Sequence, residues 1–124
     1  PKVTIEGVQI RDGKYIIRTR NSGMQIAENV QLTLEYSYAP EIILRTREIA
    51  PGTTYDFSGD VFPFSSTPAI AENFKYAETQ RALLDGSKAL VVHVRLSYSL
   101  NGTPVSLIEY TILKAKDGLY LNED

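Results

Sequence analysis

The sequence predicts an all-β fold, an antiparallel sandwich of about seven strands with one short helix inserted before the last hairpin. Apolar and polar residues alternate with a period of two over most of the chain, which is the pattern of strands with one buried face. Proline and glycine stand at hairpin-like spacing between these stretches, as at Pro51-Gly52. The chain has 124 residues and no cysteine, so it is long enough to hold one core by packing alone.

The first two expected strands form a hairpin. Residues 3–10 contain Glu6-Gly7 at their middle, which predicts an extended segment with a bulge or kink at the glycine. Asp12-Gly13 makes a tight turn into residues 14–20. The residues of this second strand that share the core-facing side are Tyr15, Ile17 and Thr19.

The middle of the chain continues with three further strands. Residues 30–36 alternate most clearly, as expected of a strand with one solvent-facing side. Residues 41–49 form a mixed strand that ends at Pro51-Gly52, and residues 53–57 form another short one. Residues 58–69 are expected to be a long connection. Its turn-forming residues are Gly59, Pro63 and Pro68.

The last third of the chain departs from the β pattern and then returns to it. Residues 69–84 fit a short amphipathic helix that stops at Asp85-Gly86, since glycine is the usual C-terminal cap. Residues 89–100 are expected to be the longest strand. Asn101-Gly102 is a strong hairpin signal, and it leads into residues 105–114. A single domain over residues 1–116 and a C-terminal tail over residues 117–124 are therefore predicted.

Strands at this spacing, with proline and glycine at the corners, describe an antiparallel sandwich of the immunoglobulin type. Asn21-Ser22-Gly23, then Ala27-Glu28-Asn29-Val30, and later Ile49-Ala50-Pro51-Gly52 carry a more specific pattern. It resembles the bacterial and archaeal Ig-like modules with N-x-G-x-x-x-A-x-N-V and I-x-P-G, over roughly the first half of the chain. Those modules include CARDB-like adhesion-related domains and similar domains placed after membrane anchors in envelope proteins. The resemblance implies a module of that kind.

The polar residues of this pattern are expected to form sandwich corners rather than a ligand site. Asn21 and Gly23 can take left-handed backbone angles that let the chain cross to the other sheet, and Ala27 is small enough to pass under the loop. Asn29 can hydrogen-bond local backbone as the next strand begins. The residues expected to act as structural turns are Asn21, Gly23, Asn29, Pro51, Gly52, Asn101 and Gly102.

Composition excludes several classes of function. A net charge of −2 and a pI near 5.4 argue against a nucleic-acid partner. The longest apolar run, residues 89–92, is far too short for a membrane helix, so no membrane insertion by this segment is expected. A membrane anchor can lie outside it, because the chain begins at Pro1 without a signal segment. The glycines are scattered singly at turns, which argues against a phosphate-binding loop.

Catalytic and metal-binding groups are also sparse. No cysteine is present, and His93, the sole imidazole, is expected on the outward face of a strand. The carboxylate pairs Glu35 with Glu48 and Asp56 with Asp60 fall in polar faces or loops, and the Asp56 to Asp60 spacing lacks the ligand density of a calcium loop. We therefore expect no enzyme activity, no cofactor and no metal.

Aromatic residues provide the remaining functional signal. The candidate partner contacts are Phe57, Phe62 and Phe64, around the long connection. Residues 58–84 are expected either to cover one end of the core or to present aromatics to a partner. The expected function is a non-catalytic Ig-like module of a larger envelope or membrane-anchored protein, extracytoplasmic or membrane-proximal, acting as a spacer or protein-interaction domain. The alternative is an accessory glycan-binding domain that uses surface aromatics, for which a flat row of exposed rings on one sheet would be diagnostic.

Overall fold

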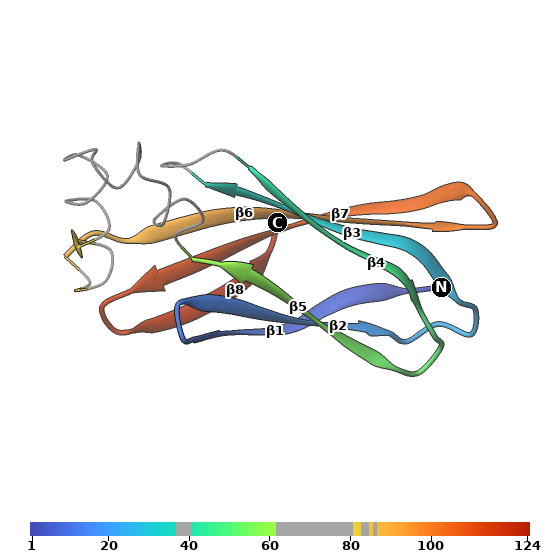
Figure 1. The fold of residues 1–124 in the computed structure, drawn as a ribbon, viewed down its shortest axis with the longest axis horizontal. Helices are drawn as coiled ribbons and strands as arrows, with labels where there is room; N and C mark the ends of the chain where they lie inside the picture. The colour runs from blue at the N-terminus through green and yellow to red at the C-terminus, as the bar shows by residue number, and fades with distance from the viewer. Residues whose placement is uncertain (37–40, 62–80, 83–84, 86) are drawn as a thin grey trace.

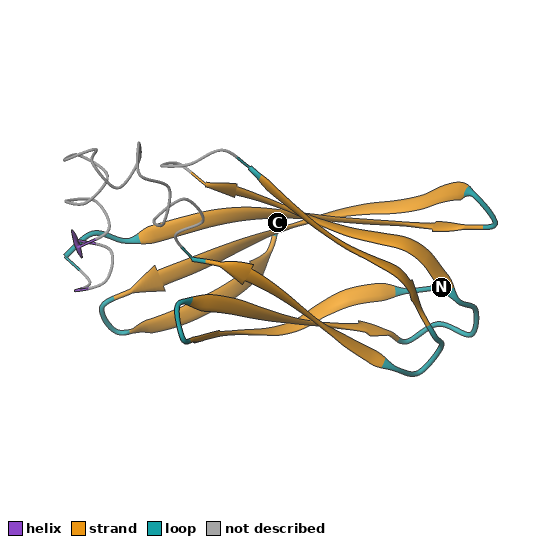
Figure 2. Ribbon diagram, in the orientation of Figure 1, coloured by secondary structure: helices purple, strands orange, loops and turns teal. Residues whose placement is uncertain are grey.

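The computed structural model describes residues 1–36, 41–61, 81–82, 85 and 87–124. In this part of the chain eight strands form two antiparallel sheets, and the inner faces of the sheets share one core (Figure 1). The sheets are elongated, and almost all the rest of the described chain is turn or loop (Figure 2). The predicted all-β class with two antiparallel sheets is confirmed, in an arrangement consistent with a sandwich.

The strands are β1 (Val3–Arg11), β2 (Lys14–Asn21), β3 (Ala27–Tyr36), β4 (Ile42–Ile49), β5 (Thr54–Asp60), β6 (Leu90–Leu100), β7 (Thr103–Ala115) and β8 (Gly118–Glu123). The smaller sheet has the order β1-β2-β5, and the larger has the order β4-β3-β6-β7-β8. At the sheet margins β1 lies next to β8, and β4 next to β5. Strands adjacent in sequence are therefore split between the sheets at three places, between β2 and β3, between β4 and β5, and between β5 and β6.

The predicted tight turns are confirmed by their backbone angles. Asp12-Gly13 has φ values of 53° and 75°, and Asn101-Gly102 has 51° and 77°, the left-handed pair that a two-residue hairpin turn needs. Gly52 has φ 72°, as required at the third position of a turn with proline at the second. The β1–β2 register shifts between Ile5 and Gly7, so the bulge at the glycine is confirmed.

Alternation along the strands builds the core. The predicted inward face of β2 is fully buried, and so are the alternate residues of β6 through Leu96. The buried apolar residues of the smaller sheet are Val3, Ile5, Tyr15, Ile17 and Phe57. Those of the larger sheet are Ala27, Val30, Leu32, Leu34, Ile49, Leu90, Val92, Val94, Leu96, Tyr98, Tyr110 and Ile112. Burying these side chains is the main source of stability, because no disulfide contributes.

Two tyrosines also join the sheets through hydrogen bonds. The Ile5 N–H of β1 donates to the Tyr110 hydroxyl of β7 at 3.1 Å, in the core. The Tyr36 hydroxyl of β3 donates to the Asp60 carbonyl of β5 at 2.9 Å. The Tyr15 hydroxyl, by contrast, is buried without a hydrogen-bond partner among the described residues, and burial raises its pKa.

The structure corrects three strand predictions. Residues 117–124 are not a tail, because Gly118–Glu123 forms β8, which pairs with β7 and packs half-buried leucines on the core. The longest described strand is β7, with 13 residues, rather than the strand over 89–100. Gly59 is not a turn residue but lies within β5, where an added Cβ would stand 3.1 Å from Leu44 and 3.2 Å from Leu34. Glycine there allows the two sheets to approach closely.

The predicted helix over residues 69–84 lies mostly outside the described residues. Arg81, Ala82 and Asp85 have helical backbone, and the Lys88 N–H donates to the Ala82 carbonyl at 3.1 Å. Pro63, Pro68 and the expected aromatic contacts of this connection also lie outside, so its role stays a prediction. The described part of the chain contains no helix long and apolar enough to cross a membrane.

Candidate interaction site

A buried amide organises one end of the sandwich. Asn21, the last residue of β2, is fully buried. Its Oδ1 accepts hydrogen bonds from the N–H groups of Lys2, at 3.1 Å, and Gly23, at 3.0 Å. Its Nδ2 donates to the carbonyls of Gln25, at 2.7 Å, and Ile49, at 3.0 Å. All four hydrogen-bonding positions of the amide are thus used, which makes its burial tolerable.

The main chain of Asn21 extends this network to the turn after β4. The Asn21 N–H donates to the Thr53 carbonyl at 3.0 Å, and the Gly52 N–H donates to the Asn21 carbonyl at 2.7 Å. The two short motifs noted in the sequence, around residues 21–30 and 49–52, therefore meet at one corner. The corner fixes the connection β2–β3 to β4, β5 and the N-terminal segment.

The roles of the predicted corner residues differ in part from expectation. Asn21 and Gly23 do not have left-handed backbone, so that prediction is wrong for both. Asn21 acts through its side chain, and Gly23 is needed for space, because an added Cβ would stand 2.7 Å from the Lys2 nitrogen and 2.8 Å from the Pro1 Cα. Asn29 is the residue with left-handed backbone, at φ 49°. Ala27 is fully buried, as its expected place under the loop requires.

Two apolar side chains project from the connection that this network holds. Met24 is 94% exposed and Ile26 is 44% exposed. Together with Pro51 and Leu100 they line a groove of about 480 Å³. The groove lies at the end of the sandwich where the connections β2–β3, β4–β5 and β6–β7 come together, at the right of Figure 1. We call it the loop-end groove.

Two carboxylates complete the loop-end groove. Glu28 of β3 and Glu48 of β4 stand directly opposite each other in the antiparallel register, and both line the groove. A Glu28 carboxylate oxygen accepts the Asn101 N–H at 2.6 Å. Neither carboxylate has an ion-pair partner within the described residues. The groove therefore combines exposed apolar side chains with two negative charges.

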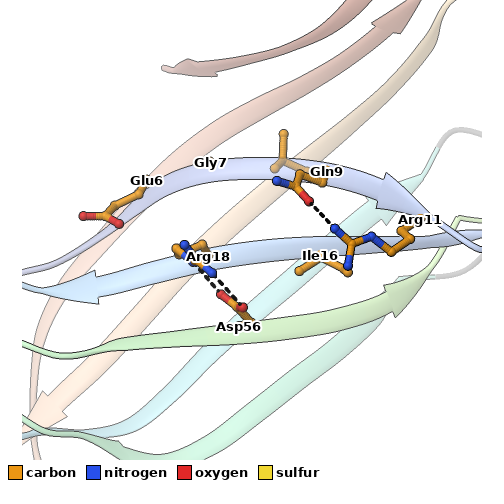
Figure 3. Close-up of a pocket in the computed structure, with 8 residues that line it drawn as sticks. Glu6, Gly7, Gln9, Arg11, Ile16, Arg18 and Asp56 are labelled. Carbon is orange, nitrogen blue, oxygen red and sulfur yellow. Dashed lines mark hydrogen bonds and ion pairs between the residues drawn. The ribbon is translucent and has the colours of Figure 1, made fainter.

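A second hollow, of about 440 Å³, lies on the outer face of β1-β2-β5 (Figure 3). It opens above Gly7, where an added Cβ would meet no atom within 4 Å. Arg18 holds Asp56 with bonds of 2.9 and 3.2 Å, and Arg11 donates to the Gln9 side chain at 3.3 Å. The hydrogen bond from Arg18 lowers the pKa of Asp56. Much of the charge in this hollow is thus already paired.

The aromatic residues predicted as contacts are placed differently. Phe57 is 3% exposed, with its ring centroid 4.8 Å from that of Tyr55, so it belongs to the core and is not presented to a partner. Phe62 and Phe64 lie outside the described residues. The exposed aromatics of the described part, Tyr55 and Tyr120, stand on different sheets and form no flat row.

The other residues weighed for chemistry are spread over the surface. His93 is exposed on β6, with its Nδ1 3.4 Å from the Thr111 hydroxyl. Glu35 binds Arg95 at 2.7 Å near the end of β3, whereas Glu48 is opposite Glu28 near its start, so the structure does not bring Glu35 and Glu48 together. The described residues contain no group of three or more His, Asp or Glu side chains arranged to hold a metal.

Sequence reasoning missed the loop-end groove. The sequence offered only one indication of it: Met24 and Ile26 are apolar residues in a connection otherwise made of small and polar residues. Comparison with protein-family models, with curated proteins and with solved structures gives no match to this chain.

Proposed function

We propose that this protein is a non-catalytic Ig-like module of a larger envelope or membrane-anchored protein, and that it binds a protein partner through the loop-end groove. The strand order supports the Ig-like part of the proposal. In immunoglobulin letters, β1-β2-β5 corresponds to A-B-E and β4-β3-β6-β7 to C′-C-F-G, with β8 as an addition. The sequence resemblance around residues 21–30 and 49–52 supports the proposed envelope setting and, with it, a proposed extracytoplasmic or membrane-proximal location.

One observation carries the interaction proposal: Met24 is 94% exposed on a connection that a fully bonded, buried amide holds in place. An exposed apolar side chain on a flexible loop could fold back on the surface, but here the corner restrains the loop. Loops held by a rigid scaffold are where proteins commonly place binding residues, and methionine adapts its shape to varied partners. A spacer would need no such exposed apolar group.

A photo-crosslinking experiment tests the proposal. Met24 is the sole methionine of the chain, so a photoactivatable methionine analogue labels this position alone. We expect a discrete crosslinked product in an extract of the source cells, competed by excess parent protein and not by the Met24→Ser/Ile26→Ser variant. The matched competitor Val91→Ser, at a 36% exposed position on β6, should compete like the parent. Equal competition by all three proteins would show that binding does not need Met24 and Ile26, and the absence of a product would count against a protein partner at the loop-end groove.

A glycan-binding function is the second candidate, and the hollow above Gly7 favours it. Gln9, Arg11 and Glu6 line this hollow with planar polar groups, which can hydrogen-bond sugar hydroxyls. Binding on an oligosaccharide array that is lost in Arg11→Ala and kept in Met24→Ser would support this candidate over the protein-interaction one. No binding to the array would exclude the oligosaccharides it carries.

A further inference from the structure

We propose that the partner segment that enters the loop-end groove carries a lysine or arginine next to an apolar side chain. This inference rests on the proposed function and specifies the chemistry of the partner. The apolar residue would cover Met24 and Ile26, and the cation would lie between Glu28 and Glu48.

The first argument is the placement of the two carboxylates. Glu28 and Glu48 are directly opposed across two antiparallel strands, where like charges destabilise the pair. Other carboxylates on the sheets are compensated by arginines, as in the pairs Arg18–Asp56 and Arg95–Glu35. Among the described residues no cation within 4.0 Å compensates Glu28 or Glu48. A cation from outside the chain would remove this repulsion.

The second argument is that the site is partly preorganised. Glu28 is held by the Asn101 N–H at 2.6 Å, so the carboxylate keeps a fixed direction and a second oxygen for another donor. Met24, Ile26 and Leu100 stand beside it in the same groove. A partner side chain that covers these apolar groups would exclude water, and an ion pair is stronger where water is excluded.

Other occupants fit less well. A symmetric contact between two copies would bring the same carboxylates against each other. Calcium takes six to eight oxygen ligands, and two glutamates, one of them already bonded to a main-chain N–H, fall well short of that. A purely apolar segment would leave both carboxylates facing it without a counterion.

The test uses random heptapeptides displayed on phage and selected against the full 124-residue chain. We expect enriched sequences to place lysine or arginine beside leucine, methionine or an aromatic residue. The best synthetic peptide should bind Glu28→Gln/Glu48→Gln about 10-fold more weakly than the parent, as expected for two partly exposed ion pairs. Its affinity should also fall between 50 and 300 mM salt, as screening strengthens.

A matched control removes the same charge elsewhere. Glu109→Gln/Glu123→Gln changes two exposed glutamates of β7 and β8, and it should bind the peptide like the parent. Urea melts should show neither double variant to be less stable than the parent, and Glu28→Gln/Glu48→Gln should be slightly more stable because the repulsion between the two carboxylates is removed. A loss of binding then cannot be ascribed to unfolding.

The outcomes separate this inference from the proposed function. Peptides that need Met24 and Ile26 but are neutral or acidic would overturn the inference and leave the proposed function standing. Peptides whose binding is unaffected by Met24→Ser/Ile26→Ser would count against both. A calcium-induced rise in melting temperature that is absent from Glu28→Gln/Glu48→Gln would assign the carboxylates to a metal ion, and concentration-dependent dimers that the same variant abolishes would assign them to a second copy.

Discussion

The buried amide of Asn21 gives the most direct test of how this fold is held together. Asn21→Ala removes four side-chain hydrogen bonds, to Lys2, Gly23, Gln25 and Ile49. A hydrogen bond contributes about 1 kcal/mol net, and a buried group left without a partner costs about 1–3 kcal/mol. The bond to the Ile49 carbonyl is the buried one, and water can reach the other three groups in part. We therefore expect a loss of about 2–4 kcal/mol in the free energy of unfolding.

Urea denaturation followed by tyrosine fluorescence measures this loss. With a slope of about 2 kcal/mol per molar urea, in the middle of the range for small proteins, the midpoint should fall by roughly 1–2 M. Ser22→Ala is the matched control, because the Ser22 hydroxyl makes one exposed bond of 3.4 Å and its removal should change stability by less than about 0.5 kcal/mol. If Asn21→Ala were no less stable than Ser22→Ala, the amide network would not hold the corner.

Further predictions concern a tight approach, two tyrosines and one ion pair. Gly23→Ala should lower the free energy of unfolding in a urea melt by about 1–3 kcal/mol, because the new methyl group overlaps the N-terminal main chain. An unchanged midpoint would show that the N-terminal segment moves aside freely. Tyr110→Phe should lower the free energy of unfolding by about 1–2 kcal/mol, because it removes a buried hydrogen-bond acceptor. Tyr15→Phe should leave the stability unchanged or raise it, because the Tyr15 hydroxyl has no partner among the described residues. Equal losses in the two melts would contradict this account. Arg18 lowers the folded-state pKa of Asp56, so the stability that this pair contributes is complete above the unfolded carboxyl pKa of about 3.9 and is lost as the pH falls below it. An NMR titration of the Asp56 carboxyl should move toward the ordinary value in Arg18→Gln.

The sequence predicted the turns well because turn chemistry is local. Asp12-Gly13 and Asn101-Gly102 each place asparagine or aspartate before glycine, and these residues accept the left-handed angles of a tight hairpin. Alternation along residues 14–20 predicted which side chains enter the core, since successive side chains of a strand point to opposite faces. No partner beyond the neighbouring residues was needed for either prediction.

The candidate site was harder to predict because exposure depends on distant contacts. Phe57 was expected near the surface by its place before a long connection, but β5 continues past it and turns its ring inward. The exposure of Met24 does not follow from the sequence, because a methionine in a short loop can either fold onto the core or stay in solvent. Here the loop is held from the other side, and the methionine stays outside.

The sequence by itself determined most of the strands, the inward faces of those that alternate clearly, and the tight turns, because each depends on residues within a few positions of one another. Only the tertiary structure decided which strands are neighbours and which groups the Asn21 side chain binds. The side-chain bonds of Asn21 reach residues 19 positions before it and 28 after it in the chain. Tyr110 meets Ile5 across 105 positions. Such contacts depend on how two sheets stack, and the periodicity of a single strand contains no information about the strand that will face it.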